Sequence, residues 1–153
     1  MDYRSYLFVP ADQPRKLAGA AAGPADAIIL DLEDAVGLAQ KDAARQIVAG
    51  FLAAGHGAHP SGPARLIRVN ALATGMTEAD VIATARHRPA GYVLPKCAGP
   101  ADVEALARLV ATHGGGDVPI LAIATETVRA VRSLMRSDWS HPALGGLTWG
   151  ARI

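Results

Sequence analysis

Six short segments of the chain are almost continuously apolar, and polar or turn-forming residues follow each of them. They span residues 4–10, 27–32, 65–70, 91–96, 119–125 and 146–151. Continuous rather than alternating apolar character is typical of parallel strands that are covered on both faces. The pattern therefore predicts six buried strands of a parallel sheet.

Helical periodicity separates the predicted strands. Residues 41–54, 101–112 and 127–135 place apolar side chains three and four positions apart, and 14–22 is a shorter alanine-rich candidate. The segment 77–80 is typical of a helix N-terminus, where Thr77 would cap the helix and acidic residues would follow. The chain thus alternates strands with helices.

The spacing of the strands favours one architecture over another. They start at residues 4, 27, 65, 91, 119 and 146, and a (β/α)8 barrel of ~250 residues allots ~31 to each unit. A doubly wound open sheet is the competing fold, but no G-x-G-x-x-G motif follows any strand. Six strands do not close an eight-stranded barrel. We therefore expect residues 1–153 to form one TIM-barrel-type α/β domain, truncated after about six βα units.

Composition narrows the class of protein. The 153 residues carry 15 Lys and Arg against 14 Asp and Glu, which argues against binding nucleic acid or an acidic membrane by bulk charge. One cysteine excludes an internal disulfide framework, and half of the residues are hydrophobic, too many for a disordered chain. No apolar run reaches the ~20 residues of a membrane span. The N-terminus lacks the basic region and apolar stretch of a signal peptide. We expect a cytoplasmic protein.

Polar side chains follow the predicted strands at the end where barrel proteins carry their chemistry. In chain order they are Asp31, Glu33, Asp34, Arg68, Asn70, Lys96 and Glu126. By contrast, Tyr92 and Trp149 are most simply packing residues of strands, and Cys97 a small buried side chain.

Five motifs resemble the HpcH/HpaI aldolase and citrate lyase beta-chain family. They are Arg4-Ser-Tyr-Leu-Phe-Val-Pro-Ala, Ile29-Leu-Asp-Leu-Glu-Asp-Ala-Val, Ile67-Arg-Val-Asn, Val93-Leu-Pro-Lys and Ala124-Thr-Glu-Thr. Their order and spacing match throughout this chain, which corresponds to the first half to two-thirds of a family member. The first two motifs together are specific, whereas the others alone are weak.

The resemblance implies a barrel lyase that makes or breaks a carbon–carbon bond in 3-hydroxyacyl-CoA thioesters of the citryl-CoA, malyl-CoA or citramalyl-CoA type. It implies a Mg²⁺ ion that holds the keto-acid product, a thioester enolate, and trimeric full-length relatives. The family position of a metal ligand falls on Glu126, and magnesium favours carboxylates completed by water and substrate oxygens. Arg68 would bind the substrate carboxylate.

The other charged residues would support the metal and the substrate. Asp31, Glu33 and Asp34 would lie behind the metal and its water ligands. Lys96 would balance these acids or meet a substrate anion. Simpler structural interpretations remain open: Glu126 as the start of a helix, the three acids as a solvated loop, and Arg68 and Lys96 as ion-pair partners.

The sequence departs from the family after Ala151. Family members continue Trp-Gly-Ala-Glu-Asp-Leu, and that Asp is the second metal ligand; here Arg152 stands in the place of the Glu and Ile153 in the place of the Asp. We expect a truncated chain with impaired chemistry. Two alternatives stay open: a non-catalytic fragment or subunit that needs a partner, and a pyruvate-type aldehyde aldolase of the wider family.

Overall fold

The computed structural model describes residues 1, 3–56 and 62–150 as a sheet covered by helices. The strands are β1 (Tyr6–Pro10), β2 (Ala27–Asp31), β3 (Ala64–Arg68), β4 (Gly91–Leu94), β5 (Ile120–Ile123) and β6 (Leu144–Thr148). The helices are α1 (Pro14–Ala21), α2 (Lys41–Phe51), α3 (Thr77–Thr84), α4 (Pro100–Thr112) and α5 (Val128–Leu134). Short helical turns lie at Leu38–Gln40, Leu52–His56, Leu72–Thr74 and Ala85–His87. Every predicted strand and helix is present within a few residues of its expected place.

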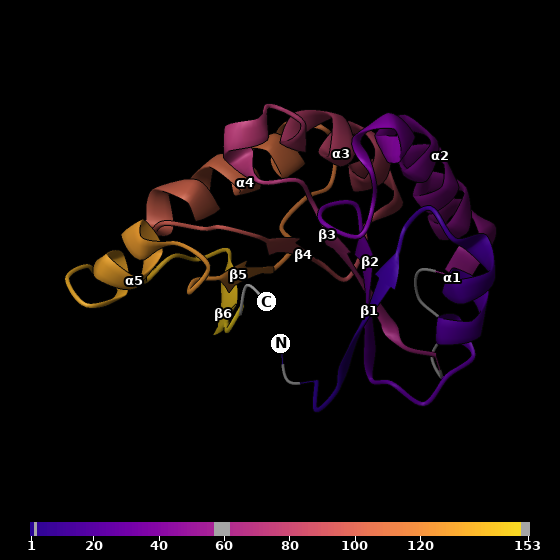
Figure 1. Cartoon of the computed structure of the whole chain (residues 1–153), viewed down its shortest axis with the longest axis horizontal. Helices are drawn as coiled ribbons and strands as arrows, with labels where there is room; N and C mark the ends of the chain where they lie inside the picture. Colours follow the sequence, from indigo (N-terminus) through magenta and orange to yellow (C-terminus); the bar gives the residue numbers. More distant parts are fainter. Residues whose placement is uncertain (2, 57–61, 151–153) are drawn as a thin grey trace.

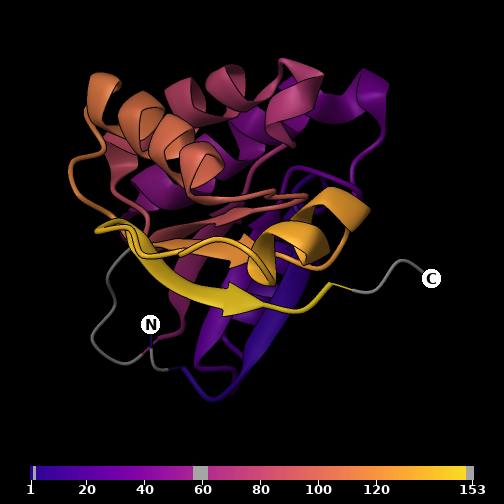
Figure 2. The same ribbon diagram turned by 90° about the vertical axis from the view of Figure 1, so that its left-hand side faces the viewer.

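The sheet is wound as in a barrel. All neighbouring strands are parallel, and they lie side by side in chain order from β1 to β6. The helices form an arc along the outside of the curved sheet, while the N-terminus lies on its inner side (Figure 1). The view turned by 90° shows the same separation of helices from the inner face (Figure 2). A doubly wound sheet would instead reverse its strand order and carry helices on both faces, so the six-unit partial barrel is confirmed.

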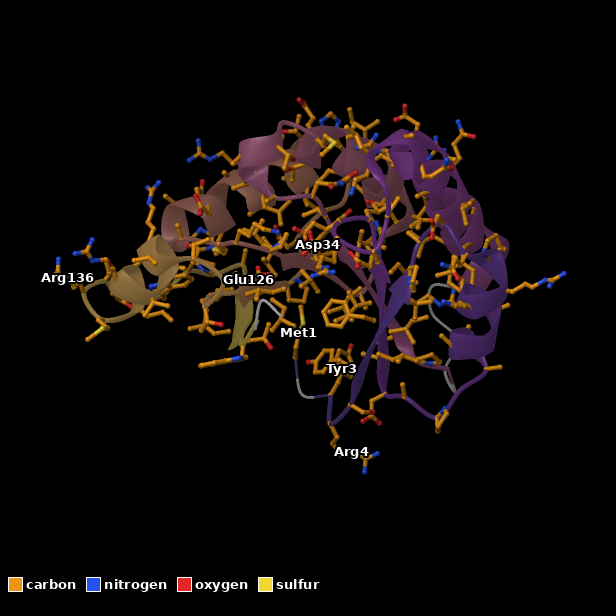
Figure 3. The ribbon with its side chains drawn as sticks, in the orientation of Figure 1. Met1, Tyr3, Arg4, Asp34, Glu126 and Arg136 are labelled. Carbon is orange, nitrogen blue, oxygen red and sulfur yellow. The ribbon has the colours of Figure 1, made fainter. Side chains whose placement is uncertain are left out.

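Two apolar clusters pack on opposite faces of the sheet. The outer cluster joins alternate strand residues such as Ile28, Leu30 and Ile67 to the inward faces of the helices. The inner cluster is smaller and joins Ala27, Ile29, Leu66, Val93, Leu121 and Ile123. Met1 and Tyr3 pack against this inner cluster, and Figure 3 shows both on the inner side of the sheet. The central strands are therefore covered on both faces, as their continuous apolar character predicts.

The outermost strands do not follow that prediction. Leu7 and Phe8 of β1 are each about half exposed, and so is Leu147 of β6. Trp149, expected to pack, is 77% exposed. Among the described residues, each of these strands pairs on one side only, so fewer neighbouring side chains cover its apolar residues.

Helix α3 begins differently from the expected capping pattern. Thr77 is the first helical residue, not the cap, and its hydroxyl donates a hydrogen bond to the backbone oxygen of Asn70 at 2.8 Å. The capping prediction was wrong because that hydroxyl ties the helix to the end of β3. Among the described residues, no helix is long and apolar enough to cross a membrane.

Candidate active site

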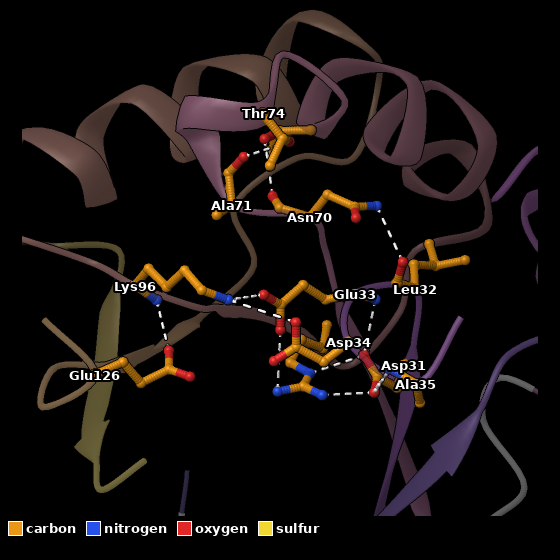
Figure 4. A network of polar contacts seen from close by, with 12 residues as sticks. Asp31, Leu32, Glu33, Asp34, Ala35, Asn70, Ala71, Thr74, Lys96 and Glu126 are labelled. Atoms are coloured by element: carbon orange, nitrogen blue, oxygen red, sulfur yellow. Dashed lines mark hydrogen bonds and ion pairs between the residues drawn. The ribbon is translucent and has the colours of Figure 1, made fainter. Parts of the chain in front are cut away.

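The charged residues predicted from the strand ends come together at the carboxyl end of the sheet (Figure 4). Register explains the first pair, because Asp31 at the end of β2 lies opposite Arg68 at the end of β3. Lys96 follows β4 by two residues, and Glu126 follows β5 by three. In Figure 3, Glu126 lies on the inner side of the arc, whereas Arg136 points away from it.

Asp31 and Arg68 form a two-pronged ion pair. Arg68 donates from Nε to Oδ1 at 2.8 Å and from Nη2 to Oδ2 at 2.5 Å. The same carboxylate accepts the backbone N–H groups of Glu33 and Ala35, at 2.8 and 3.2 Å. Burial acts to lower the pKa of Arg68, but the hydrogen bond and charge of Asp31 outweigh it and raise that pKa overall. The guanidinium is thus a fixed positive charge, and its carbon lies 4.8 Å from the centre of the Phe8 ring.

Glu33 lies between two cations. Its Oε2 atom is 3.2 Å from Nη1 of Arg68, and its Oε1 atom accepts a hydrogen bond from Nζ of Lys96. The Glu33 side chain is buried, and burial raises its pKa despite the two cations. Nζ of Lys96 also lies 3.6 Å from Oδ1 of Asp34, whose side chain is mostly exposed. Asp34 is therefore the one solvated member of the three predicted acids.

Lys96 also holds Glu126 through its backbone. Its N–H donates to Oε2 of Glu126 at 2.7 Å, while its side chain reaches Glu33 on the other side. Lys96 has a φ of 54°, in the left-handed region that non-glycine residues seldom adopt. Such a conformation costs ~1 kcal/mol or more and persists where surrounding contacts enforce it. Here it allows one residue to link the ends of β2 and β5.

Gly150 permits the close approach of the chain after β6 to Glu126. A Cβ atom at this position would lie 2.6 Å from Cγ of Glu126 and 2.5 Å from Cγ2 of Ile123, so any side chain would collide with both. Two hydrogen bonds join Gly150 to the Thr125 hydroxyl, one from its N–H and one to its carbonyl oxygen. The end of β6 is thereby fixed beside the predicted metal ligand.

The residues present supply part of a magnesium site. Glu126 uses one carboxylate oxygen for Lys96, and its other oxygen makes no hydrogen bond to any described residue. One carboxylate with water and substrate oxygens suits magnesium. Within residues 1, 3–56 and 62–150, however, no group of three or more His, Cys, Asp or Glu side chains is placed to hold a metal. Arg152 and Ile153, which stand in the family's acidic positions, lie outside the described residues.

Two features of the site were not predicted. Asn70 does not join the charged cluster, because its side chain donates to the backbone oxygen of Leu32 and to Asp80 on α3. Lys41, at the start of α2, donates to the backbone oxygens of Leu32 and Glu33. The signal in the sequence was a lysine at the first turn of the helix that follows an acidic loop, where a cation opposes the helix dipole.

Cavities mark two regions of the surface. One of about 330 Å³ borders Lys96 and is lined also by Cys97, Thr127 and Arg129. Cys97 is buried as expected, and burial raises the pKa of its thiol to about 11. A second cavity, of about 680 Å³, lies before β5 and β6 at the opposite end of these strands, and Glu104 and His141 line it. Only the first adjoins the charged cluster.

A partial β/α barrel with a charged cluster at the carboxyl ends of its strands defines a protein of the barrel-enzyme class. The chain belongs to the HpcH/HpaI aldolase/citrate lyase family, whose sequence model matches residues 4–136. The predicted resemblance is confirmed.

Relatives and a solved structure agree with this assignment. The chain is 34% identical over 148 residues to a (3S)-malyl-CoA thioesterase of Cereibacter sphaeroides, covering 97% of this chain and 48% of the relative. It is 41% identical over 147 residues to a citrate lyase subunit beta-like protein of Mycobacterium tuberculosis, covering 95% and 46%. The M. tuberculosis citrate lyase beta subunit complexed with oxaloacetate and magnesium superposes with a TM-score of 0.69 at 34% identity, covering 95% and 57%. The chain thus spans about half the length of these two relatives.

Proposed function

We propose that this chain carries the substrate-binding arginine and one metal ligand of a magnesium-dependent carbon–carbon lyase that acts on 3-hydroxyacyl-CoA thioesters. The observation that supports it most is the meeting of Arg68 and Glu126 with Glu33 and Lys96 at the carboxyl end of the sheet. Membership of the family and the solved relative with oxaloacetate and magnesium support the same chemistry.

Arg68 would bind the carboxylate of the substrate. Two of its five N–H groups bond to Asp31, which leaves donors for a second carboxylate. Asp31 and Glu33 hold the guanidinium plane in place, so binding requires little reorganisation. Phe8 covers one face of the guanidinium and limits its access to water.

Cleavage of such a substrate breaks the bond between C2 and C3. The hydroxyl group at C3 loses its proton and becomes the carbonyl group of the released acid, and the electron pair of the broken bond passes to the thioester as an enolate. The proton lost at this hydroxyl balances the one that the enolate takes up at C2. Protonation of that enolate completes the acyl-CoA product. Bound magnesium, held by Glu126, would supply Lewis-acid stabilisation of the oxygen at C3. Lys96 would keep Glu126 oriented through its backbone N–H.

A direct assay separates this chemistry from its alternatives. The chain is incubated with malyl-CoA and MgCl₂, and the products are resolved by mass spectrometry. Carbon–carbon cleavage gives acetyl-CoA and glyoxylate, whereas thioester hydrolysis, the activity named for one relative, gives malate and CoA. Pyruvate with an aldehyde acceptor tests the aldolase alternative.

Variants of the site residues, each with a matched control, test whether cleavage of malyl-CoA depends on the charged cluster. Glu126→Gln and Arg68→Met should each lower cleavage by about 100-fold or more. Their controls, Glu78→Gln and Arg15→Met, change exposed residues outside the cluster and should leave it unaltered. If the unmodified chain neither cleaves malyl-CoA nor binds oxaloacetate with magnesium, the proposal fails, and the non-catalytic alternative takes its place.

A further inference from the structure

Lys41 places a buried ammonium against the backbone of the acidic loop. Its Nζ atom donates to the carbonyl oxygens of Leu32 at 2.6 Å and of Glu33 at 2.7 Å. The residue is 8% exposed, and this burial lowers its pKa, although the charges of nearby carboxylates oppose that effect. An ammonium removed from water and bonded to two consecutive carbonyls restrains the chain more than a surface ion pair does.

A second donor restrains the same loop from the next strand. The side-chain N–H of Asn70 donates to the Leu32 oxygen at 3.0 Å, as Figure 4 shows. Asn70 is held in turn by Asp80, which accepts hydrogen bonds from its backbone and its side chain, both at 2.7 Å. Arg45, one turn after Lys41 on α2, donates to the other oxygen of Asp80 at 2.8 Å. Helices α2 and α3 thus jointly support the end of β2.

The loop held in this way carries the charged cluster on its other side. The backbone of Glu33 is bound at both of its polar groups: its N–H donates to Asp31, and its carbonyl accepts from the Lys41 ammonium and, at 3.2 Å, from the N–H of Val36. Its side chain is directed to Arg68 and Lys96. A change in the peptide plane after Glu33 would therefore move the carboxylate that lies between these cations.

We propose that Lys41 is a positioning residue that fixes the conformation of residues 32–35, so that the Glu33 carboxylate stays between Arg68 and Lys96. Its consequence for catalysis rests on the proposed function, because Glu33 helps to orient the guanidinium that would bind substrate. The effect on the loop itself does not depend on any ligand.

Amide hydrogen exchange on the free chain tests the effect on the loop. Lys41→Met keeps the length of the side chain and removes its donors, whereas Lys96→Met removes the ammonium that touches Glu33 at its carboxylate. We expect Lys41→Met to lower the protection of the Glu33 and Ala35 amides by about tenfold, the effect of losing one to two hydrogen bonds. Lys96→Met should lower it by less than about threefold, since the Lys96 ammonium contacts the side chains of Glu33 and Asp34, whereas the Lys41 ammonium binds the backbone of the loop.

The amides of the central strands serve as the reference for global stability. If Lys41→Met lowers protection equally in the loop and in β3 and β4, Lys41 has a merely structural role and the proposal is overturned. Unchanged protection of the loop would also overturn it. If Lys41→Met does not fold, Lys41→Gln, with a shorter side chain that retains a polar head, is measured against the same expectation.

Binding of oxaloacetate in the presence of MgCl₂, measured by titration calorimetry, tests the consequence for the site. Lys41→Met should weaken the affinity about fivefold or more while the strand amides remain protected, and Lys16→Met, on the exposed face of α1, should not change it. Equal affinity in Lys41→Met and the unmodified chain would contradict the proposal. If the unmodified chain neither binds oxaloacetate nor cleaves malyl-CoA, the proposed function fails, and the exchange experiment still decides the role of Lys41.

Discussion

Two regions of the sheet, one around β2 and β3 and the other around α5 and β6, differ in how far the described residues cover their apolar side chains. Around β2 and β3, outward-facing residues such as Leu30 and Ile67 are fully buried beneath helices. Around α5 and β6, Val128, Met135 and Trp149 are 75%, 82% and 77% exposed. Exposed apolar side chains that adjoin one another are typical of a surface that binds other polypeptide, whereas single ones are common on any protein. The comparison separates a region stabilised by contacts within the chain from one whose apolar surface the described residues leave uncovered.

Buried polar groups do not divide the molecule in the same way. On the β2–β3 side, Asp80 is fully buried yet accepts hydrogen bonds from Arg45 and Asn70. Among the described residues, buried polar atoms without a hydrogen-bond partner occur in both regions: they include atoms of Arg45 and Arg65 near β2 and β3, and the indole N–H of Trp139 near α5. Buried polar groups are normally paired, because an unpaired one costs free energy. The β2–β3 region is therefore called the completed side for the cover of its apolar side chains alone.

Asp80→Ala should have the largest effect on the completed side. The substitution leaves donors of Arg45 and Asn70 buried without their acceptor, and we expect a loss of about 3–5 kcal/mol in the free energy of unfolding. Glu78→Ala, on the same helix, removes an exposed carboxylate 3.3 Å from His113 and should cost about 1 kcal/mol or less. Urea denaturation measures both. Equal losses in the two variants would mean that the buried network contributes little.

Leucine truncation compares the two regions with one chemical change. Leu30→Ala removes a fully buried side chain from β2 and should lower the free energy of unfolding by about 2–5 kcal/mol. Leu147→Ala acts on a half-exposed side chain of β6 and should cost less than about 1 kcal/mol. Thermal and urea unfolding give the two values. A cost for Leu147→Ala as large as that for Leu30→Ala would show that β6 is covered in solution.

Sequence reasoning predicted burial correctly for the central strands of the sheet. Continuous apolar runs identified β2, β4 and β5 because both faces of those strands are buried. The same signal placed Trp149 inside, although it lies at a sheet edge. The sequence pattern identifies a residue as apolar but does not show whether another element covers it. That depends on which strand lies at the edge of the sheet.

The candidate site was predicted in part for a similar reason. Strand ends identify Asp31, Glu33, Arg68, Lys96 and Glu126, because carboxyl ends of parallel strands share one edge. The support from Lys41 and Asp80 was not predicted, since it depends on how α2 and α3 lie across the sheet. The left-handed backbone of Lys96, which gives its N–H to Glu126, also has no signal in the residue type.

Trp149→Ser should reduce association of the chain through the uncovered side. Burial of one indole contributes to the free energy of association. Its loss should therefore raise the concentration needed for self-association by about tenfold. Leu38→Ser is the matched control: Leu38 is 76% exposed but lies just before α2, on the completed side. Sedimentation velocity over a concentration series measures both. A shift as large for Leu38→Ser would remove the distinction between a scattered exposed residue and an apolar surface.

Carboxylate titration offers the smallest and most local test. Burial raises the pKa of Glu33 above its ordinary 4.5, whereas the hydrogen bonds from His141 and Arg108 lower the pKa of the exposed Glu104 below that value. Side-chain ¹³C NMR should therefore find the two midpoints on opposite sides of 4.5. Because protonation of Glu33 favours the folded chain, its contribution to stability is present at low pH and declines as pH rises through its folded pKa; for Glu104 the contribution is lost as pH falls.

Two variants test which interactions set the pKa of Glu33. Lys96→Met removes a hydrogen bond that lowers the pKa of Glu33, so its midpoint should rise further, while that of Glu104 stays where it is. Glu33→Gln should abolish the decline in stability that Glu33 causes as pH rises. A Glu33 midpoint at or below 4.5 in the unmodified chain would mean that the two cations outweigh burial. The cluster at the strand ends would then be a charge-stabilised ion-pair network, and the buried carboxylate would not be held there at a cost.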